Sequence, residues 1–128
     1  MDVFGNTQAL LTTVITSLYT CPERASVTVG SVAGVTASAE VSNVQAQITS
    51  IIVTEIAGGA ATYSLWVTPD GTTPALAEAT QIASSVSISA NEVHMLSHGL
   101  VLAPGMRIWG QAGADNDLVI TINHIEVL

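Results

Sequence analysis

The feature that most constrains this chain is an alternation of apolar and polar residues with a period of two, interrupted at intervals by turn residues. The clearest case is the segment 61–68, in which one face holds Ala61, Tyr63, Leu65 and Val67 and the other Thr62, Ser64, Trp66 and Thr68. This period is typical of β-strands that bury one face. The sequence therefore predicts an all-β protein.

Similar patterns recur along the chain and predict strands at 12–19, 26–29, 45–56, 82–90, 106–112 and 118–127. Gly58-Gly59 predicts a hairpin that joins 45–56 to 61–68, because glycine accepts the positive φ of tight turns. About eight strands in 128 residues favour a single antiparallel β-sandwich of the jelly-roll type, with one domain over 1–128. Residues 1–12 could form an N-terminal arm, and residues 30–43 an extra hairpin or an arm.

The last expected strand changes phase within its length. Leu118, Ile120 and Ile122 share one face, but the apolar residues then continue at Ile125 and Val127. One extra residue in the ladder would produce this change. We therefore predict a β-bulge near Asn123-His124.

The charge balance excludes several classes of partner. Of the 128 residues, 48% are hydrophobic and 9% charged, and the net charge is −8 with no lysine. Arg24 and Arg107 alone cannot neutralise a phosphate backbone or hold a basic helix on a membrane, so we expect neither nucleic acid nor membrane as a partner. The segment 3–22 is too polar to cross a bilayer, and no basic residue precedes Arg24, so we expect no secretory signal and synthesis in the cytoplasm. Cys21, as the single cysteine, is expected to be a buried thiol.

No pattern of catalytic or cofactor-binding residues stands out. His94 and His98 are four residues apart, but they lie in a β-rich stretch, and no nearby carboxylate or cysteine completes a metal set with them or with His124. The run Asp115-Asn116-Asp117 carries oxygen ligands that calcium would accept, yet such runs between strands usually form turns. We expect no enzyme activity, no cofactor and no metal.

The outward positions indicate a protein interface. In the strand 106–112 the inward set is Met106, Ile108, Gly110 and Ala112, which leaves Arg107, Trp109 and Gln111 facing outward. Trp66 also lies on the outward face of its strand, and Trp and Arg are enriched at binding hot spots. The interface candidates are therefore Trp66, Arg107, Trp109 and Gln111; the alternative is that each tryptophan packs under a loop of its own chain. A surface of Thr, Ser, Gln and Asn with so few charges is typical of a protein buried in an assembly.

The order of short motifs resembles a group of small tailed-bacteriophage virion proteins, β-sandwiches that decorate heads or belong to tails. The motifs are Leu18-Tyr19-Thr20-Cys21-Pro22, the strand 49–53, Ser64-Leu65-Trp66-Val67, Gly99-Leu100-Val101-Leu102 with Pro104-Gly105, and the strand 119–127. The chain departs from that pattern in a longer segment 24–44 and in Gly105-Met106, where the pattern has Gly-Asp. The resemblance implies a location in the virion and a homo-oligomer, often a trimer.

The leading hypothesis is a non-enzymatic capsid decoration or cement protein that binds the major capsid protein or other virion proteins and stabilises the head. Negative charge favours a site away from packaged DNA, such as the outer capsid surface. A tail, neck or fibre component, including one that contacts a receptor, is the second hypothesis. A carbohydrate-binding β-sandwich is the third, and it would need Trp66 and Trp109 exposed in one groove.

Overall fold

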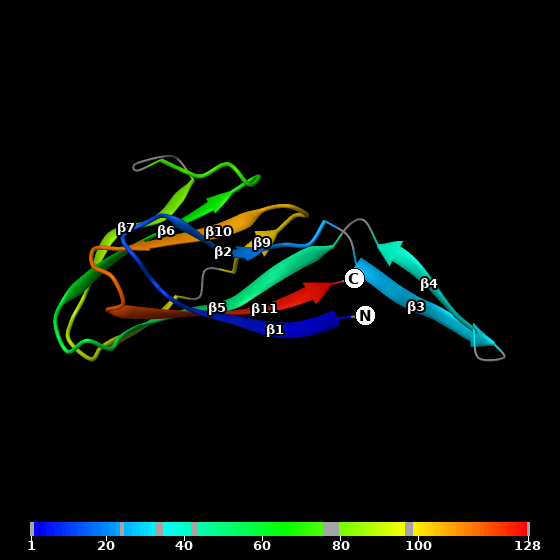
Figure 1. Cartoon of the computed structure of the whole chain (residues 1–128), viewed down its shortest axis with the longest axis horizontal. Helices are drawn as coiled ribbons and strands as arrows, with labels where there is room; N and C mark the ends of the chain where they lie inside the picture. Colours follow the sequence, from blue (N-terminus) through cyan, green and yellow to red (C-terminus); the bar gives the residue numbers. More distant parts are fainter. Residues whose placement is uncertain are drawn as a thin grey trace.

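Strands make up almost all of the regular structure of this protein. The computed structural model describes residues 2–23, 25–32, 35–41, 44–75, 80–96 and 99–127, and it describes side chains for 3–23, 44–75, 80–96 and 99–127. These residues contain eleven strands and no helix. They therefore include no helix long and apolar enough to span a membrane. Nine strands form two antiparallel sheets packed together, which confirms the predicted all-β sandwich. The two sheets lie as layers in Figure 1.

The first sheet is built around a pair of long central strands. Its order is β1 (Asp2–Leu10), β11 (Leu118–Val127), β5 (Gln45–Glu55) and β8 (Val93–Leu96). Strand β9 (Val101–Leu102) also pairs with β5, along a different part of that strand from β8. Strand β1 pairs with β11 along its whole length, so residues 2–10 do not form the N-terminal arm considered for 1–12. They form an edge strand of the body.

The second sheet has the order β2 (Thr16–Thr20), β10 (Arg107–Ala112), β6 (Ala61–Thr68) and β7 (Gln81–Ile88). Consecutive strands β5 and β6 therefore lie in different sheets, and the predicted hairpin between them is wrong. The glycine turn is present, with Gly58 at φ 83°, but it carries the chain from one sheet to the other. The two glycines correctly predicted a turn. They carry no information about which strands β5 and β6 pair with.

The core fills the space between the two sheets. The buried apolar side chains come from both inner faces and include Val53, Tyr63, Leu65, Ile108, Leu118, Ile120 and Ile122. Tyr63, Leu65, Ile108 and Ala112 are inward as the alternation predicted. Side chains of neighbouring strands close over Gly110, where an added Cβ would lie 2.7 Å from Leu18 Cδ1 of β2.

The predicted bulge occurs at the expected point of the ladder, but the extra residue lies on the neighbouring strand. Asn123 pairs with Ser50 and His124 with Ile48, so Thr49 of β5 is left out of the ladder, and its hydroxyl donates to Asn123 O at 3.2 Å. Strand β11 keeps its phase, and the predicted phase change is wrong. His124 continues the buried series of Ile120 and Ile122 instead of leaving it.

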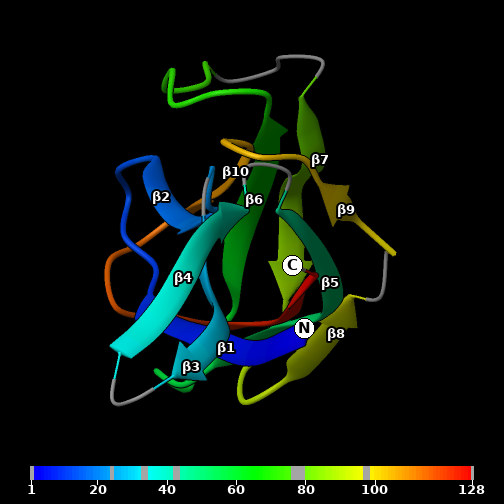
Figure 2. The ribbon, with the colours of Figure 1, turned by 90° about the vertical axis from the view of Figure 1, so that its right-hand side faces the viewer.

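A two-stranded hairpin projects from one end of the sandwich. It consists of β3 (Ala25–Val32) and β4 (Val35–Val41), which pair with each other and with no other described strand. In Figures 1 and 2 the hairpin leaves the end of the body where residues near both termini lie. The segment expected as an extra hairpin at 30–43 is thus a hairpin, but it begins at Ala25 and takes in the strand that we had expected at 26–29. We call it the arm.

Candidate assembly interface

Most of the outer face of the first sheet carries no charge. The register of the five strands aligns fifteen outward residues in four adjacent rows, and a fifth row at one end, Asp2–Val127–Gln45, holds one acidic residue. The rows are Phe4–Ile125–Gln47–Val101, Asn6–Asn123–Ser50, Gln8–Thr121–Ile52–Met95 and Leu10–Val119–Thr54–Val93. All fifteen are apolar or uncharged polar residues. We call this set the uncharged face.

Large apolar side chains are exposed on the uncharged face. Phe4 is 76% exposed and Met95 68%, and Leu10, Val93 and Val101 are exposed as well. The row between the apolar ones is polar, and there Asn123 Nδ2 donates to Ser50 Oγ at 2.8 Å. The five exposed apolar residues lie on the edge strands β1, β8 and β9, and exposed apolar area on one sheet face favours a site of interaction. The uncharged face therefore has the composition of a protein interface.

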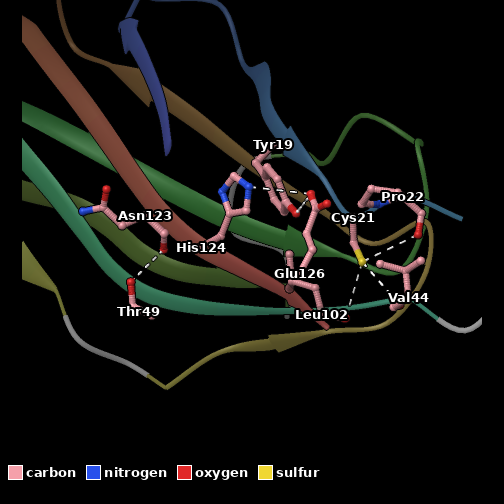
Figure 3. Close-up of polar contacts among 9 residues, drawn as sticks. All are labelled: Tyr19, Cys21, Pro22, Val44, Thr49, Leu102, Asn123, His124 and Glu126. Carbon is pink, nitrogen blue, oxygen red and sulfur yellow. Dashed lines mark hydrogen bonds and ion pairs between the residues drawn. The ribbon is translucent and has the colours of Figure 1, made fainter. Parts of the chain in front are cut away.

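The two ends of the arm are fixed in the core of the body. Cys21 precedes the arm and Val44 follows it, and both residues are fully buried. The Cys21 thiol lies 3.6 Å from the carbonyl oxygens of Val44 and Leu102, as Figure 3 shows. Cys21 N–H donates to Met106 O at 2.9 Å, and Gly105 N–H donates to Cys21 O at 3.0 Å. The arm thus projects from a buried, hydrogen-bonded site. We call the residues of this site, Cys21, Val44, Leu102, Gly105 and Met106, the base.

Three titratable side chains pack beside this base. Tyr19 OH donates to Glu126 Oε1 at 2.8 Å, and His124 Nε2 lies 3.6 Å from the same oxygen. The Tyr19 and His124 rings stack with centroids 4.3 Å apart (Figure 3). Burial, and then the hydrogen bond and charge of Glu126, raise the pKa of Tyr19 far above its ordinary value, so it stays a neutral donor. Gly5 makes room for the ring, because a Cβ there would lie 2.8 Å from His124 Nε2.

The base also gives Cys21 an unreactive thiol. Burial raises the pKa of Cys21, whereas reactive cysteines have a lowered pKa and access to solvent. We expect a thiol reagent to modify native Cys21 at least about 1,000-fold more slowly than an exposed thiol, because reaction requires opening of the base. Chromogenic thiol titration of the native protein measures this rate.

The matched control is the variant Val14→Cys, which adds a thiol at a loop position that is 67% exposed. Its added thiol should react at the rate of a free cysteine while Cys21 stays protected. Equal rates for the two thiols would mean that the base opens readily and that the arm is not held by it.

His94 is engaged through both ring nitrogens. Nδ1 is 2.8 Å from the hydroxyl of buried Tyr63, and Nε2 is 2.6 Å from Glu92 Oε1. The hydrogen bond from His94 lowers the pKa of the Glu92 carboxyl. His98, the other member of the spacing noted in the sequence, lies outside the described residues. Within the described residues no three His, Cys, Asp or Glu side chains form a group that could hold a metal ion.

The acidic run before β11 has a structural contact. Asp115 Oδ1 accepts the backbone N–H of Thr13 at 2.8 Å, and Asn116 adopts a positive φ of 62°. Both features are typical of a turn that joins two strands. The contact ties the β10–β11 turn to the loop before β2.

Both tryptophans lie on the outward face as predicted, but they are buried, as in the alternative that each packs under its own chain. Alternation places Trp66 and Trp109 on the outer face of the second sheet, where they are cross-strand partners. Trp66 is nevertheless fully buried and Trp109 is 5% exposed. Trp109 Nε1 donates to Thr68 Oγ1 at 2.8 Å, and Thr68 Oγ1 donates to Asp70 O at 2.6 Å. The hydrogen bonds connect Trp109 to the loop that follows β6.

The same loop and its neighbours also contact the other two interface candidates. The backbone of Gly71 lies against the guanidinium of Arg107, and Pro74 in this loop is buried. Gln111 Nε2 donates to the carbonyl oxygen of Thr13 at 2.8 Å. Arg107 and Gln111 are half-buried. The structure therefore brings all four candidates together on one face, but under contacts from their own chain.

Sequence reasoning missed the uncharged face. Two of its five strands, β5 and β11, were predicted, and β1, β8 and β9 were not. The rows can be recognised only once the strand order β1-β11-β5-β8 is known. A usable signal was present, because the outward positions of 45–56 and 118–127 are all uncharged.

Comparison with known proteins adds no relative. No family model, no curated protein and no solved structure matches this chain.

Proposed function

We propose that this chain is a non-enzymatic structural subunit of a tailed-phage particle, a decoration or cement protein on the outside of the head. The observation that carries the proposal is the uncharged face, fifteen aligned residues without a single charge on a chain of net charge −8. A free surface is typically about a quarter to a third charged. A face of this kind is suited to contact with other protein subunits.

The projecting arm supports the same proposal. A hairpin of two strands is marginal by itself in water, so an arm of this kind is suited to packing against another subunit. The short sequence motifs that resemble phage virion β-sandwiches favour a particle as the assembly. The net charge of −8 favours the outer surface of the particle, because a negatively charged protein and the packaged DNA repel each other.

The chemistry of cementing is mass action. A protein that binds only the assembled lattice stabilises that lattice over its dissociated subunits. Several modest contacts on one oligomer raise the effective concentration of the remaining ones, so attachment becomes firm. Because these contacts contain few ion pairs, attachment should depend only weakly on salt.

The carbohydrate-binding alternative has no support from the tryptophans. It required Trp66 and Trp109 to line an exposed groove, and both are buried. The tail, neck or fibre alternative stays open and is one outcome of the test below.

We expect phage particles assembled without this chain to lose DNA at a lower temperature than complete particles. Adding the purified protein back should restore the resistance, in low and in high salt alike. Cryo-electron microscopy of the complete particle should place the chain on the outer head surface. Equal resistance of the two preparations would contradict the cement role, and density confined to the tail would favour the second candidate.

A further inference from the structure

The arm has one apolar set of ladder positions and one polar set. The register pairs Ala25 with Val41, Val27 with Ala39 and Val32 with Val35, and a bulge at Val29 shifts the pairing by one residue. The shift keeps the two sets in phase across the whole hairpin. One set comprises Ala25, Val27, Gly30, Val32, Val35, Ala37, Ala39 and Val41, and the other Ser26, Thr28, Ser31, Thr36, Ser38 and Glu40. Alternate positions share one face of a strand pair, so the arm is amphipathic.

No other described strand pairs with β3 or β4. The arm forms a separate two-stranded sheet, and Figure 1 shows it extending beyond the end of the sandwich. Three strands with an apolar face, or packing against another element, are needed for independent stability. The arm therefore needs a second surface.

We propose that the apolar face of the arm packs on the uncharged face of a second copy of this chain. The proposal rests on the proposed function, because it assigns the contact by which the structural subunit would form an oligomer. Two sheets can pack face to face at about 10 Å when their side chains interdigitate. Apolar positions filled only by Val, Ala and Gly leave room for the exposed Phe4, Met95 and Val101 of the partner's face.

Charge selects a second copy as the occupant. Two copies each carry −8, so they repel each other least through surfaces without acidic groups. The single charged residue in β3 and β4, Glu40, occupies the polar set. The uncharged face contributes none, so this contact joins two acidic molecules without burying a carboxylate.

The size of the contact predicts a closed oligomer. A hairpin about 26 Å long and about 10 Å wide buries roughly 260 Å² on each partner, or roughly 500 Å² in total. One such contact is below the size of a specific interface, whereas a reciprocal pair places two of them, roughly 1,000 Å², between the same two copies, and a ring of three closes three of them. Because arm and face are different surfaces, each copy uses both, and closure gives a reciprocal pair or a ring.

The test compares charges on the two faces of the arm and on the body. We expect Val27→Asp on the apolar set, or Val101→Glu on the uncharged face, to raise the dissociation constant of the oligomer by about 100-fold or more, because each buries an unpaired carboxylate. The controls are Thr28→Asp, one residue away on the polar set, and Val14→Glu on an exposed loop. Both controls should leave the oligomer intact. Sedimentation velocity measures the dissociation, and slow modification of Cys21 verifies that each body is folded.

Mixing the two disrupted variants separates this contact from others. A copy with Val27→Asp keeps its face and a copy with Val101→Glu keeps its arm, so the mixture can form one native contact per pair. Because one contact is weaker than a closed oligomer, we expect native mass spectrometry to detect mixed dimers only at concentrations above those at which the wild type associates, yet below those at which either variant self-associates. Disruption by Val101→Glu without disruption by Val27→Asp would show face-to-face packing instead and would overturn the proposal.

A wild-type chain that is monomeric at micromolar concentration would also overturn the arm–face contact. It would leave the proposed function standing if the monomer still restored heat resistance to particles. An oligomer that depends on the arm but never binds particles would support the arm–face contact and contradict the proposed function.

Discussion

Replacing Trp66 with alanine is expected to lower the free energy of unfolding by about 3–5 kcal/mol, the usual cost of removing a large buried aromatic side chain. Trp66 lies on the outer side of its sheet and yet has no exposed area. The loss comes from removed apolar contact and the cavity that remains, because Trp66 Nε1 has no hydrogen-bond partner to lose. Urea denaturation followed by far-UV circular dichroism measures the change.

Two phenylalanine variants give the matched comparison. Trp66→Phe removes part of the side chain and no hydrogen bond. Trp109→Phe removes a similar volume and also the donor to Thr68 Oγ1. We expect Trp109→Phe to cost about 1 kcal/mol more than Trp66→Phe. A Trp66→Ala variant that loses less than about 1 kcal/mol would mean that this face is open in solution and available to a partner.

Replacing Glu55 is expected to destabilise the end of the sandwich opposite the arm and to change how stability depends on pH. Its carboxylate accepts backbone N–H groups from two turns, at 2.7 Å from Asn91, 2.7 Å from Ala57 and 3.0 Å from Gly58. Glu55→Ala leaves these donors without their acceptor, so the melting temperature should fall strongly. Differential scanning calorimetry at neutral pH measures the shift.

The sign of the pH effect follows from the direction of the pKa shift. The N–H of Asn91, together with those of Ala57 and Gly58, lowers the pKa of Glu55 below its ordinary 4.5 despite burial. The unfolded chain therefore binds a proton at a higher pH than the native chain does. The stabilisation is complete above 4.5 and is lost as the pH falls through the native pKa.

Glu55→Gln removes this titration while keeping one oxygen acceptor. We expect the unfolding free energy of this variant to fall less steeply with acid than that of the wild type. Glu92→Gln is the control, since the pKa of Glu92 is lowered mainly by an exposed contact with His94. If the unfolding free energy of Glu55→Gln fell with acid as steeply as that of the wild type, the acid sensitivity would come from other carboxylates.

Local pattern predicted six of the nine strands of the sandwich, but it predicted their partners poorly. The alternation at 61–68 correctly assigned Tyr63 and Leu65 to the core, because side chains of a strand alternate between faces whatever lies beside it. The same alternation placed Trp66 and Trp109 outward, and it had no information about the loop that contacts that side. Gly58-Gly59 marked a turn, but residues flanking a turn need not pair with each other.

The bulge shows a second limit of the sequence. The run from Leu118 to Val127 does contain a break in its apolar pattern at His124, and the ladder is irregular there. The extra residue is on β5, at Thr49, and the break in the pattern reflects the polar pair His124 and Glu126 near Tyr19. Only the spatial neighbours of a strand determine whether an inward polar residue is a bulge or a hydrogen-bonded core position.

The pairing of β1 with β11 determines how this molecule responds to tension. Asp2 lies opposite Val127, so pulling these two ends apart loads the hydrogen-bonded pairs one after another, like a zipper. A pull that enters through the arm instead reaches Cys21 and Val44 together and spreads over both sheets. Tension between residues 2 and 127 should therefore unpair β1 from β11 at low force, whereas tension between the arm and the body should be resisted by both sheets.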